Sequence, residues 1–426
     1  RYRATSCKTG YKVVSGECVP LTCGEYLRDV QGKTVATTID ELKTALSDSS
    51  NKNKDIIYSP EQATSWESIT VSTMYGKSLA SGQGYAAQYP LWCNSAPRPK
   101  VKFESKLTST SNIQKFENID LYFYGSSSGR FSILSGVKFN NVYAEFLWGA
   151  KVYGASINNS NFKLKDNTYI YSDAQFNNTK ITVTSFYDFI ISGSNTVFSD
   201  SSFEGGEGEI IVQNNFKPVN TDFNVKTITM DIGLSYEVFI SGSASHKINI
   251  RADEMSLRGI AGINYANVYI KDSCIGCSNC KGGRPNNLYK EGGISLYNTK
   301  WYLYENSVPH NICVGNRNVV GTPTSNGKDF ASTNSYIVTS RSSKRGLYNK
   351  ASHYKWCGKG NACGSNNFYY IGSNGRKIQG IHICDTLWCE HRGRSHTKNG
   401  GGFIIFNGNE DKWGHDGGDS GYGSFS

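Results

Sequence analysis

A short apolar–polar motif recurs at nearly regular intervals between Phe116 and Phe203. Each copy begins with a large apolar residue and continues with small polar ones, most often Asn-Asn. The leading residues lie 18, 19 and 22 positions apart and are Phe139, Ile157, Phe176 and Phe198. A period near 20 predicts a stack of similar structural units. The alternative is that Asn and Ser are merely abundant and that some copies are coincidental.

The residues between the copies alternate as strands do, and no stretch here has a convincing helical period. One face is expected to carry Ile181, Val183, Ser185, Tyr187 and Phe189. A copy too short to bury its own apolar face must stack on its neighbours. Strands joined as successive coils run parallel, about 4.8 Å apart. The sequence therefore predicts an all-β parallel β-helix, with the four leading residues in one inward-facing column.

The Asn-Asn pairs are expected at tight bends, because asparagine tolerates the left-handed backbone conformation. Stacked at the same bend of successive coils, their side chains are expected to form amide ladders. Two of these pairs, at Asn158 and Asn177, also begin formal N-glycosylation sequons. Turn chemistry explains their positions equally well.

The best helix signal lies before the repeats. Thr38-Ile39-Asp40-Glu41 reads as a capping box, and Ile39, Leu42, Ala45 and Leu46 form one apolar stripe. Two strand-like segments follow, at residues 56–58 and 68–71.

This order, TIDELKTAL…KDIIYS…SITV, is similar to the entry of right-handed β-helix proteins of the pectate-lyase-like superfamily. The resemblance extends over roughly residues 33–300. It implies a right-handed parallel β-helix (solenoid) whose N-terminal end is covered by the helix. It implies no function by itself.

The expected organisation has three parts. Residues 1–30 form a disulfide-closed N-terminal segment, and residues 31–305 form the β-helix with a capping helix near 38–47. Residues 306–426 form a loop-rich, disulfide-containing C-terminal domain or cap, with a flexible Gly-rich tail after Asn407. Residues 72–100, which contain Gly, Ser and Pro, are interpreted as an insertion between early coils.

Twelve cysteines in local groups indicate disulfides in an exported protein. Close spacing suggests short bridges for the pairs Cys7/Cys18, Cys357/Cys363 and Cys384/Cys389. Cys23 and Cys93 are expected to tie the N-terminal region to the first coils. The connectivity stays open, because sequence does not determine it. The chain begins with Arg1, which suggests a processed protein, and we expect an extracellular or cell-surface location.

Two cysteine groups also have the spacing of metal ligands. One is Cys274-x-x-Cys277-x-x-Cys280, with Cys313 as a candidate fourth ligand. The other comprises His382, Cys384, Cys389 and His391. Disulfides are the favoured interpretation of both groups, so neither a metal nor another cofactor is predicted.

No catalytic set emerges from the sequence. Polygalacturonase-type β-helix enzymes resemble one another in an N-T-D, D-D, G-H-G and R-I-K series, and this chain has only Asn220-Thr221-Asp222. Inverting hydrolysis needs two positioned carboxyl groups. The group Arg251, Asp253 and Glu254 matches lyase chemistry poorly, since it is a single cluster on one coil. We assign no catalytic residue.

The formal net charge is +10, from 45 basic and 35 acidic residues. This charge suits an anionic glycan or a cell surface, although it also serves solubility alone. Nucleic acid is not an expected partner, because no recognised motif accompanies the charge. No apolar run is long enough to predict a membrane span.

The pattern as a whole predicts a secreted, non-enzymatic structural or adhesive solenoid. It is expected to self-assemble into an extracellular filament or surface layer, with residues 1–30 and 407–426 at the contact. The alternative is a polysaccharide-binding or polysaccharide-cleaving β-helix protein, either a lyase or a hydrolase.

Overall fold

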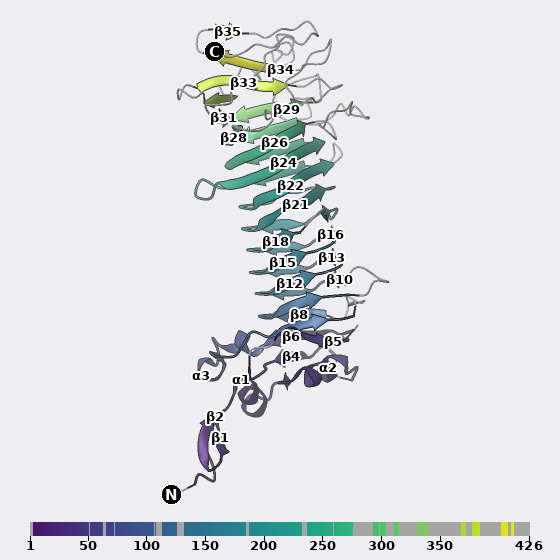
Figure 1. Ribbon diagram of the computed structural model, residues 1–426, viewed down its shortest axis with the longest axis vertical. Coiled ribbons are helices and arrows are strands. Elements are labelled where there is room, and N and C mark those ends of the chain that lie inside the picture. The colour runs from purple at the N-terminus through teal and green to yellow at the C-terminus, as the bar shows by residue number, and fades with distance from the viewer. Residues whose placement is uncertain are drawn as a thin grey trace. The chain divides into compact units, whose positions relative to one another are not determined.

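The computed structural model describes residues 3–275 apart from 51, 63–64, 72, 106, 108–112, 126–131, 185–186, 232–236 and 259, and mainly strand segments beyond residue 275. The fold is a mostly β, parallel solenoid of about 10 turns with a short N-terminal helix (Figure 1). The chain divides into two units, residues 1–184 and 185–426, which are described in turn.

The first unit contains short helices near its start and short strands throughout. The helices are α1 (Cys23–Glu25), the π-helical turn η1 (Tyr26–Val30), α2 (Ile39–Ser47), the 3₁₀ turn η2 (Gly82–Tyr85) and α3 (Pro90–Cys93). The strands are β1 (Tyr11–Val14), β2 (Glu17–Pro20), β3 (Val35–Ala36), β4 (Asp55–Tyr58), β5 (Glu67–Ile69), β6 (Lys77–Ser81), β7 (Lys100–Phe103), β8 (Ile113–Glu117), β9 (Asp120–Phe123), β10 (Ser132–Ser135), β11 (Lys138–Asn140), β12 (Tyr143–Phe146), β13 (Ala150–Tyr153), β14 (Ser156–Asn158), β15 (Asn161–Leu164), β16 (Thr168–Ser172), β17 (Gln175–Asn177) and β18 (Lys180–Val183).

One coil of this unit consists of three short strands, and each strand pairs in parallel with the equivalent strand of the next coil. The strand β11 pairs with β14, β12 with β15, and β13 with β16. Burial alternates along them, as in β9 and β15, where every second residue is buried. Alternate side chains therefore point into the coil, and the others point out.

The bend between the first and second strands of a coil is made by a residue with positive φ. Asn118, Asn141, Asn159 and Asn178 occupy it, with φ between 46° and 53°. Their side chains form ladder bonds: Asn141 Nδ2 donates to Asn118 Oδ1 at 2.6 Å, and Asn178 Nδ2 to Asn159 Oδ1 at 2.8 Å. The second asparagine of each Asn-Asn pair thus takes the conformation that the sequence suggested.

The buried residue before each of these bends stacks on its counterparts. Phe139 pairs in register with Phe116 and Ile157, and Ile157 pairs with Phe176. All four side chains are buried. The rings of Phe116 and Phe139 stack with centroids 5.3 Å apart, close to the spacing of neighbouring strands. The core of this unit is therefore a column of large apolar residues, one from each coil.

The helix α2 covers the first coil. Thr38 Oγ1 accepts from the Glu41 amide, and the Glu41 carboxylate accepts from the Thr38 amide, so the predicted capping box is formed. Leu42 and Leu46 are buried. Lys77 from β6 is also buried, and its Nζ donates to the carbonyl oxygens of Leu46 and Asp48. A lysine from the second coil thereby satisfies the C-terminal end of the helix.

The interpretation of residues 72–100 as an insertion is wrong for residues 77–81. These residues form β6, which pairs with β4 and β8 and is buried at all five positions. The segment shows no alternation because Lys77 and Ser81 are buried as well as the apolar residues. The turns of η2 and α3, which follow β6, lie outside the ladder of strands.

Two disulfides hold the N-terminal part of this unit. Cys7–Cys18 closes the antiparallel hairpin of β1 and β2, and Cys23–Cys93 joins α1 to α3. Both pairings agree with the sequence prediction. The second bond lies in a small buried cluster with Leu27, Ile57 and Ala96, so it fixes the helical turns against the first coils.

The second unit continues the parallel pattern with longer strands. Its strands are β19 (Asp188–Ile191), β20 (Val197–Ser199), β21 (Ser202–Val212), β22 (Asp222–Asp231), β23 (Glu237–Ser241), β24 (Ile248–Arg258), β25 (Ile260–Asn264), β26 (Ala266–Ile275), β27 (Gly293–Tyr297), β28 (Lys300–Leu303), β29 (Asn311–Val314), β30 (Phe330–Thr333), β31 (Ser335–Thr339), β32 (Phe368–Ile371), β33 (Lys377–Ile383), β34 (Gly402–Asn407) and β35 (Glu410–Lys412).

Within this unit the same bend and core recur. Asp200 and Asn220 have positive φ, and Asn220 Nδ2 donates to Asp200 Oδ1 at 3.0 Å. Phe198 is buried in β20 and packs on Phe203 and Phe216. Strands β32 to β35 pair antiparallel, unlike the coils before them.

The alternation predicted for residues 181–189 is interrupted. Strand β18 ends at Val183 and β19 begins at Asp188, so the segment is not one strand. Tyr187 is 38% exposed, whereas Phe189 is 1% exposed. Tyr187 and Phe189 therefore differ in burial, although the predicted alternation places them on one face.

Replacing Phe176 by alanine is expected to lower the free energy of unfolding by about 3–5 kcal/mol, because it opens a cavity in the buried column. Gln175→Ala in the same strand is the control, since Gln175 is exposed. Chemical denaturation of both variants measures the difference. Equal stability of the two variants would contradict the proposed column.

Replacing Cys23 and Cys93 together by alanine is expected to cost about 2–4 kcal/mol, because their bond closes a loop of 70 residues in the unfolded chain. The matched control replaces Cys7 and Cys18, whose bond closes only a local hairpin. Unfolding of the solenoid, followed by circular dichroism, should respond strongly to the first double variant and weakly to the second.

Candidate functional site

The outward side of the first unit carries one continuous set of aromatic and charged side chains. The paired register of β5, β7, β9 and β12 aligns Ser68, Lys102, Tyr122 and Glu145 across successive coils. Trp66 and Tyr124 lie beside this column and are 39% and 40% exposed. The term aromatic–lysine face is used below for Trp66, Lys102, Tyr122, Tyr124, Glu145 and Lys165.

The rings of this face contact one another and the lysine ammonium groups. The centroid of Tyr122 lies 5.8 Å from that of Trp66 and 6.4 Å from that of Tyr124. Lys102 Nζ lies 4.4 Å from the centroid of Tyr124, and Lys165 Nζ lies 5.7 Å from that of Tyr122. These distances are within the range of cation–π attraction, which favours exposed rings and cations side by side.

Glu145 forms ion pairs with Lys163 and Lys165. It is 8% exposed, and its carboxylate lies 2.5 Å from Lys165 Nζ and 3.8 Å from Lys163 Nζ. The Tyr143 hydroxyl donates to it at 2.8 Å. Burial alone would raise the pKa of Glu145, but the bonds from Lys165 and Tyr143 hold it below the usual 4.5. Glu145 is therefore ionised at neutral pH and is not suited to act as a proton donor.

Both hydrogen-bond partners of Glu145 have raised pKa values. Hydrogen bonding to Glu145 raises the pKa of Lys165, while burial and the same carboxylate raise the pKa of Tyr143. A second ion pair, Lys102–Glu104 at 2.8 Å, lies on the same side of the unit. Because the carboxylates hold the ammonium groups against the rings, the face has a defined shape before any partner binds.

A separate set of rings lies on the third strand of the coils. The rings of Tyr153 and Tyr171 stack with centroids 4.8 Å apart, and Tyr169 lies 5.9 Å from Tyr171. They come from β13 and β16, which pair in parallel with a register shift between Val152 and Tyr153. Exposed tyrosines are thus present on two sides of this unit.

The sequence analysis missed one pair of carboxylates in the second unit. Asp188 of β19 and Glu209 of β21 are register partners on neighbouring parallel strands. Burial, and then the charge of Glu209, raise the pKa of Asp188. Thr229 donates to Glu209. A sequence signal exists, because Asp188-Phe189-Ile190-Ile191 and Glu209-Ile210-Ile211-Val212 share an acidic residue followed by three apolar ones.

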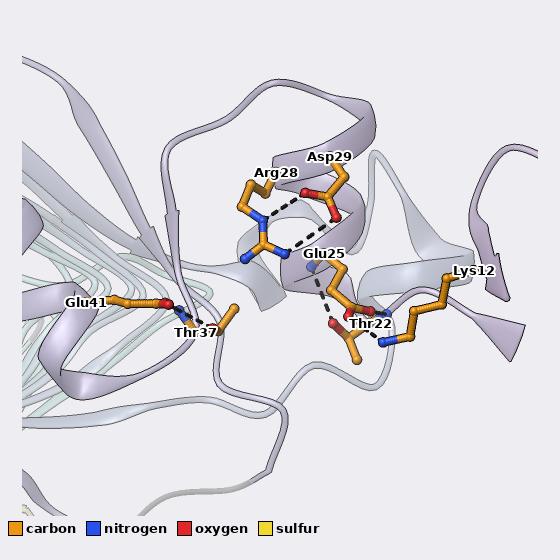
Figure 2. A network of polar contacts seen from close by, with 7 residues as sticks. All are labelled: Lys12, Thr22, Glu25, Arg28, Asp29, Thr37 and Glu41. Atoms are coloured by element: carbon orange, nitrogen blue, oxygen red, sulfur yellow. Dashed lines mark hydrogen bonds and ion pairs between the residues drawn. The ribbon is translucent and has the colours of Figure 1, made fainter. Parts of the chain in front are cut away.

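A polar network surrounds the helical turns near the N-terminus (Figure 2). Thr22 and Glu25 form a capping box, and Lys12 from the hairpin forms an ion pair with Glu25. Burial would raise the pKa of Glu25, but the Lys12 and Thr22 bonds lower it. Arg28 contacts Asp29, and Glu41 accepts from Thr37. These contacts cap helices and attach the hairpin, so we interpret the network as structural.

Other sequence candidates have structural partners. Asn220 and Thr221 of the N-T-D tripeptide form a bend, and Asp222 Oδ1 accepts from the Asn249 amide at 2.6 Å. Of the two sequons, Asn177 Nδ2 donates to Asn158 Oδ1 at 2.9 Å, which makes both asparagines part of a ladder.

The remaining candidates fall outside the described side chains. These are Cys274, Cys277, Cys280, Cys313, Cys357, Cys363, His382, Cys384, Cys389 and His391. Among the side chains that are described, no group of three or more His, Cys, Asp or Glu residues is placed to hold a metal ion. None of the described helices is long and apolar enough to cross a membrane.

The chain matches no family model, no curated protein and no solved structure. The functional argument therefore rests on the side chains described above. The aromatic–lysine face is the strongest candidate, since it combines exposure, aligned register and fixed charges.

Glu145→Gln is expected to destabilise the protein by about 1–3 kcal/mol at neutral pH, because it replaces the charged acceptor of these hydrogen bonds with a neutral amide. A carboxylate whose folded pKa is depressed stabilises above its unfolded pKa, near 4.5, and this contribution is lost as the pH falls through the folded pKa. The difference between wild type and variant should therefore shrink below about pH 4.5.

The control for this comparison is Glu104→Gln, which removes a more exposed ion pair with Lys102. Denaturation between pH 3 and 7 is expected to give a smaller difference for it. A Glu145→Gln effect that does not change with pH would contradict the role assigned to this carboxylate.

Proposed function

We propose that the protein is a secreted, non-enzymatic, structural or adhesive β-solenoid that assembles with copies of itself into an extracellular filament or surface layer. The observation that carries this proposal is the aromatic–lysine face. Exposed aromatic groups gathered on one side of a regular stack are typical of contact surfaces, where tyrosine and tryptophan are enriched. The two disulfides support an oxidising location outside the cytosol.

We also infer that the coils wind in the right-handed sense. Connections between parallel strands of one sheet are right-handed in nearly all proteins. The resemblance of the segment from Thr38 to Val71 to the entry of the pectate-lyase-like superfamily supports the same handedness. Membership of that superfamily stays part of the proposal.

The N-terminal hairpin supplies a second contact surface for assembly. Val13 and Val14 of β1 are 40% and 45% exposed, and β1 pairs only with β2 among the described strands. A free strand edge with apolar side chains is a template for pairing with another chain. A hairpin that binds an unlike surface of the next copy makes a heterologous contact, which repeats into an open fibre. The tail after Asn407 is proposed to contribute to the same contact.

The second candidate function is binding of an anionic polysaccharide. Lys102 and Lys165 are the observation that favours it, because their ammonium groups lie against the exposed ring of Tyr124 and the half-buried ring of Tyr122. Flat aromatic rings pack on the faces of sugar units, and lysines attract carboxylate or sulfate groups. The positive net charge supports the same partner. Polysaccharide cleavage is the weaker form of this candidate, and its only support among the described residues is the Asp188–Glu209 pair.

The test compares Trp66→Ser/Tyr124→Ser with Tyr187→Ser. Tyr187 is a matched control, since it is as exposed as the two altered residues but lies outside the face. The double variant is expected to raise the concentration needed for assembly by roughly tenfold, which corresponds to about 1.4 kcal/mol. Negative-stain electron microscopy and light scattering measure assembly.

Isothermal titration with polygalacturonate, on the same three proteins, separates the two candidates. Normal assembly of the double variant would contradict the role of the face in self-association. Binding of polygalacturonate that the double variant loses would favour the second candidate. Release of shortened chains, abolished by Asp188→Asn, would favour cleavage.

A further inference from the structure

Arg251 in the second unit is an exposed arginine whose guanidinium lies over an aromatic ring. Arg251 of β24 is the register partner of Tyr269 of β26, and its guanidinium carbon lies 4.3 Å from the centre of the tyrosine ring. This distance is within the range of cation–π attraction. A guanidinium held over a ring still offers the N–H groups along its edge, which form a fixed fork for a planar acid.

Among the side chains that the structure describes, no carboxylate forms an ion pair with Arg251. Arg28 and Arg98 differ in this respect, because they pair with Asp29 and Asp120. The charges of those two arginines are therefore used within the chain. Arg251 is held in place by a neutral ring instead, so its charge is available to an anion on a partner.

Asparagine residues border Arg251 on the same face of the sheet. Asn224 of β22 is its register partner on the side opposite β26, and it is exposed. Asn249 lies two residues before Arg251 on β24 and therefore faces the same way. Asn267 is the register partner of Asn249, and its Nδ2 donates to Asn249 Oδ1 at 3.5 Å. Because an amide both donates and accepts, these side chains suit hydroxyl groups next to the guanidinium.

We propose that Arg251 and the asparagines beside it bind an oxyanion group of an acidic sugar chain, either a carboxylate or a sulfate. The guanidinium supplies paired N–H donors to the oxyanion, and the amides supply partners to neighbouring hydroxyls. The face is built from the parallel strands β22, β24 and β26, so equivalent positions recur at steps of about 4.8 Å. A linear chain with repeated polar groups can contact several of these positions at once.

The charges on either side of Arg251 favour one placement of the sugar chain. Lys247, which is exposed, lies four residues before Arg251, and Asp253 lies two residues after it. A negative group is attracted at the lysine end of this row and repelled at the aspartate end. The acidic groups of the ligand are therefore expected at Arg251 and toward Lys247. This site belongs to the second unit, so it is separate from the aromatic–lysine face and does not rest on self-assembly.

The test is isothermal titration of the full-length protein with trigalacturonate, a sulfated galactose trisaccharide and neutral galactotriose. Wild type is expected to bind at least one acidic probe and not the neutral one. Arg251→Gln should weaken that binding by about tenfold or more, as for a lost charged hydrogen bond. Arg28→Gln is the control and should bind normally, because it removes the same charge from an arginine that has its own partner. The acidic probe whose binding depends on Arg251 identifies the oxyanion.

Arg251→Lys separates recognition by the guanidinium fork from attraction to any positive charge. It keeps the charge but loses the planar pair of donors, so its binding should also be weak. Equal binding by Arg251→Lys and wild type, unchanged binding by Arg251→Gln, or no binding of either acidic probe would overturn the proposal. So would Arg251-dependent binding of a peptide of residues 408–426 alone, because that acidic segment would then be the ligand.

Two further measurements keep this test separate from that of the proposed function. Trp66→Ser/Tyr124→Ser should retain the Arg251-dependent binding, whatever it does to assembly. Arg251→Gln should assemble as wild type does in electron microscopy and light scattering. Loss of assembly in Arg251→Gln would place Arg251 at a contact between copies and contradict the assignment to a sugar chain.

Discussion

The structure depends on one backbone conformation repeated at one bend of successive coils. A non-glycine residue rarely adopts positive φ, and asparagine and aspartate do so at the lowest cost. The backbone N–H of such a residue donates to a carbonyl of the next coil, as from Asn141 to Asn158 and from Asn220 to Ser241. The same residue therefore both turns the chain and fixes the position of the next coil through this hydrogen bond. The residues concerned are Asn118, Asn141, Asn159, Asn178, Asp200 and Asn220.

Fixing the bend also fixes what each side of the sheet presents. A shift of one residue would exchange the inward and outward side chains of a whole strand. In β9 the register places Leu121 and Phe123 in the core, so Tyr122 must face outward beside Lys102. The stacked phenyl rings and the aromatic–lysine face are thus two results of a single alignment. The ion pairs of Glu145 then hold the outward side chains in place.

Much of the fold could be predicted from the sequence, because the patterns that specify the repeat and the helix are local. The spacing of Phe139, Ile157 and Phe176 gave the repeat, and a box of four residues gave the helix start. Features that require register between distant segments were missed. Asp188 and Glu209 begin similar segments, but their pairing also depends on the number of residues between those segments, which the shared pattern does not specify. Strand β6 was missed for a different reason, since the burial of Lys77 beneath a helix removes the alternation that marks a strand.

The asparagine ladder has a consequence for the order of events during synthesis. Asn158 and Asn177 are acceptors by sequence, yet each is half-buried and their side-chain amides are bonded to one another. An oligosaccharyltransferase needs an extended, accessible acceptor, and the closed coil does not offer one. In a secretory pathway that glycosylates, sugar transfer and coil closure would therefore compete for the same nitrogen atoms. In such a pathway, the reaction that comes first would determine whether these two coils carry a ladder or a glycan.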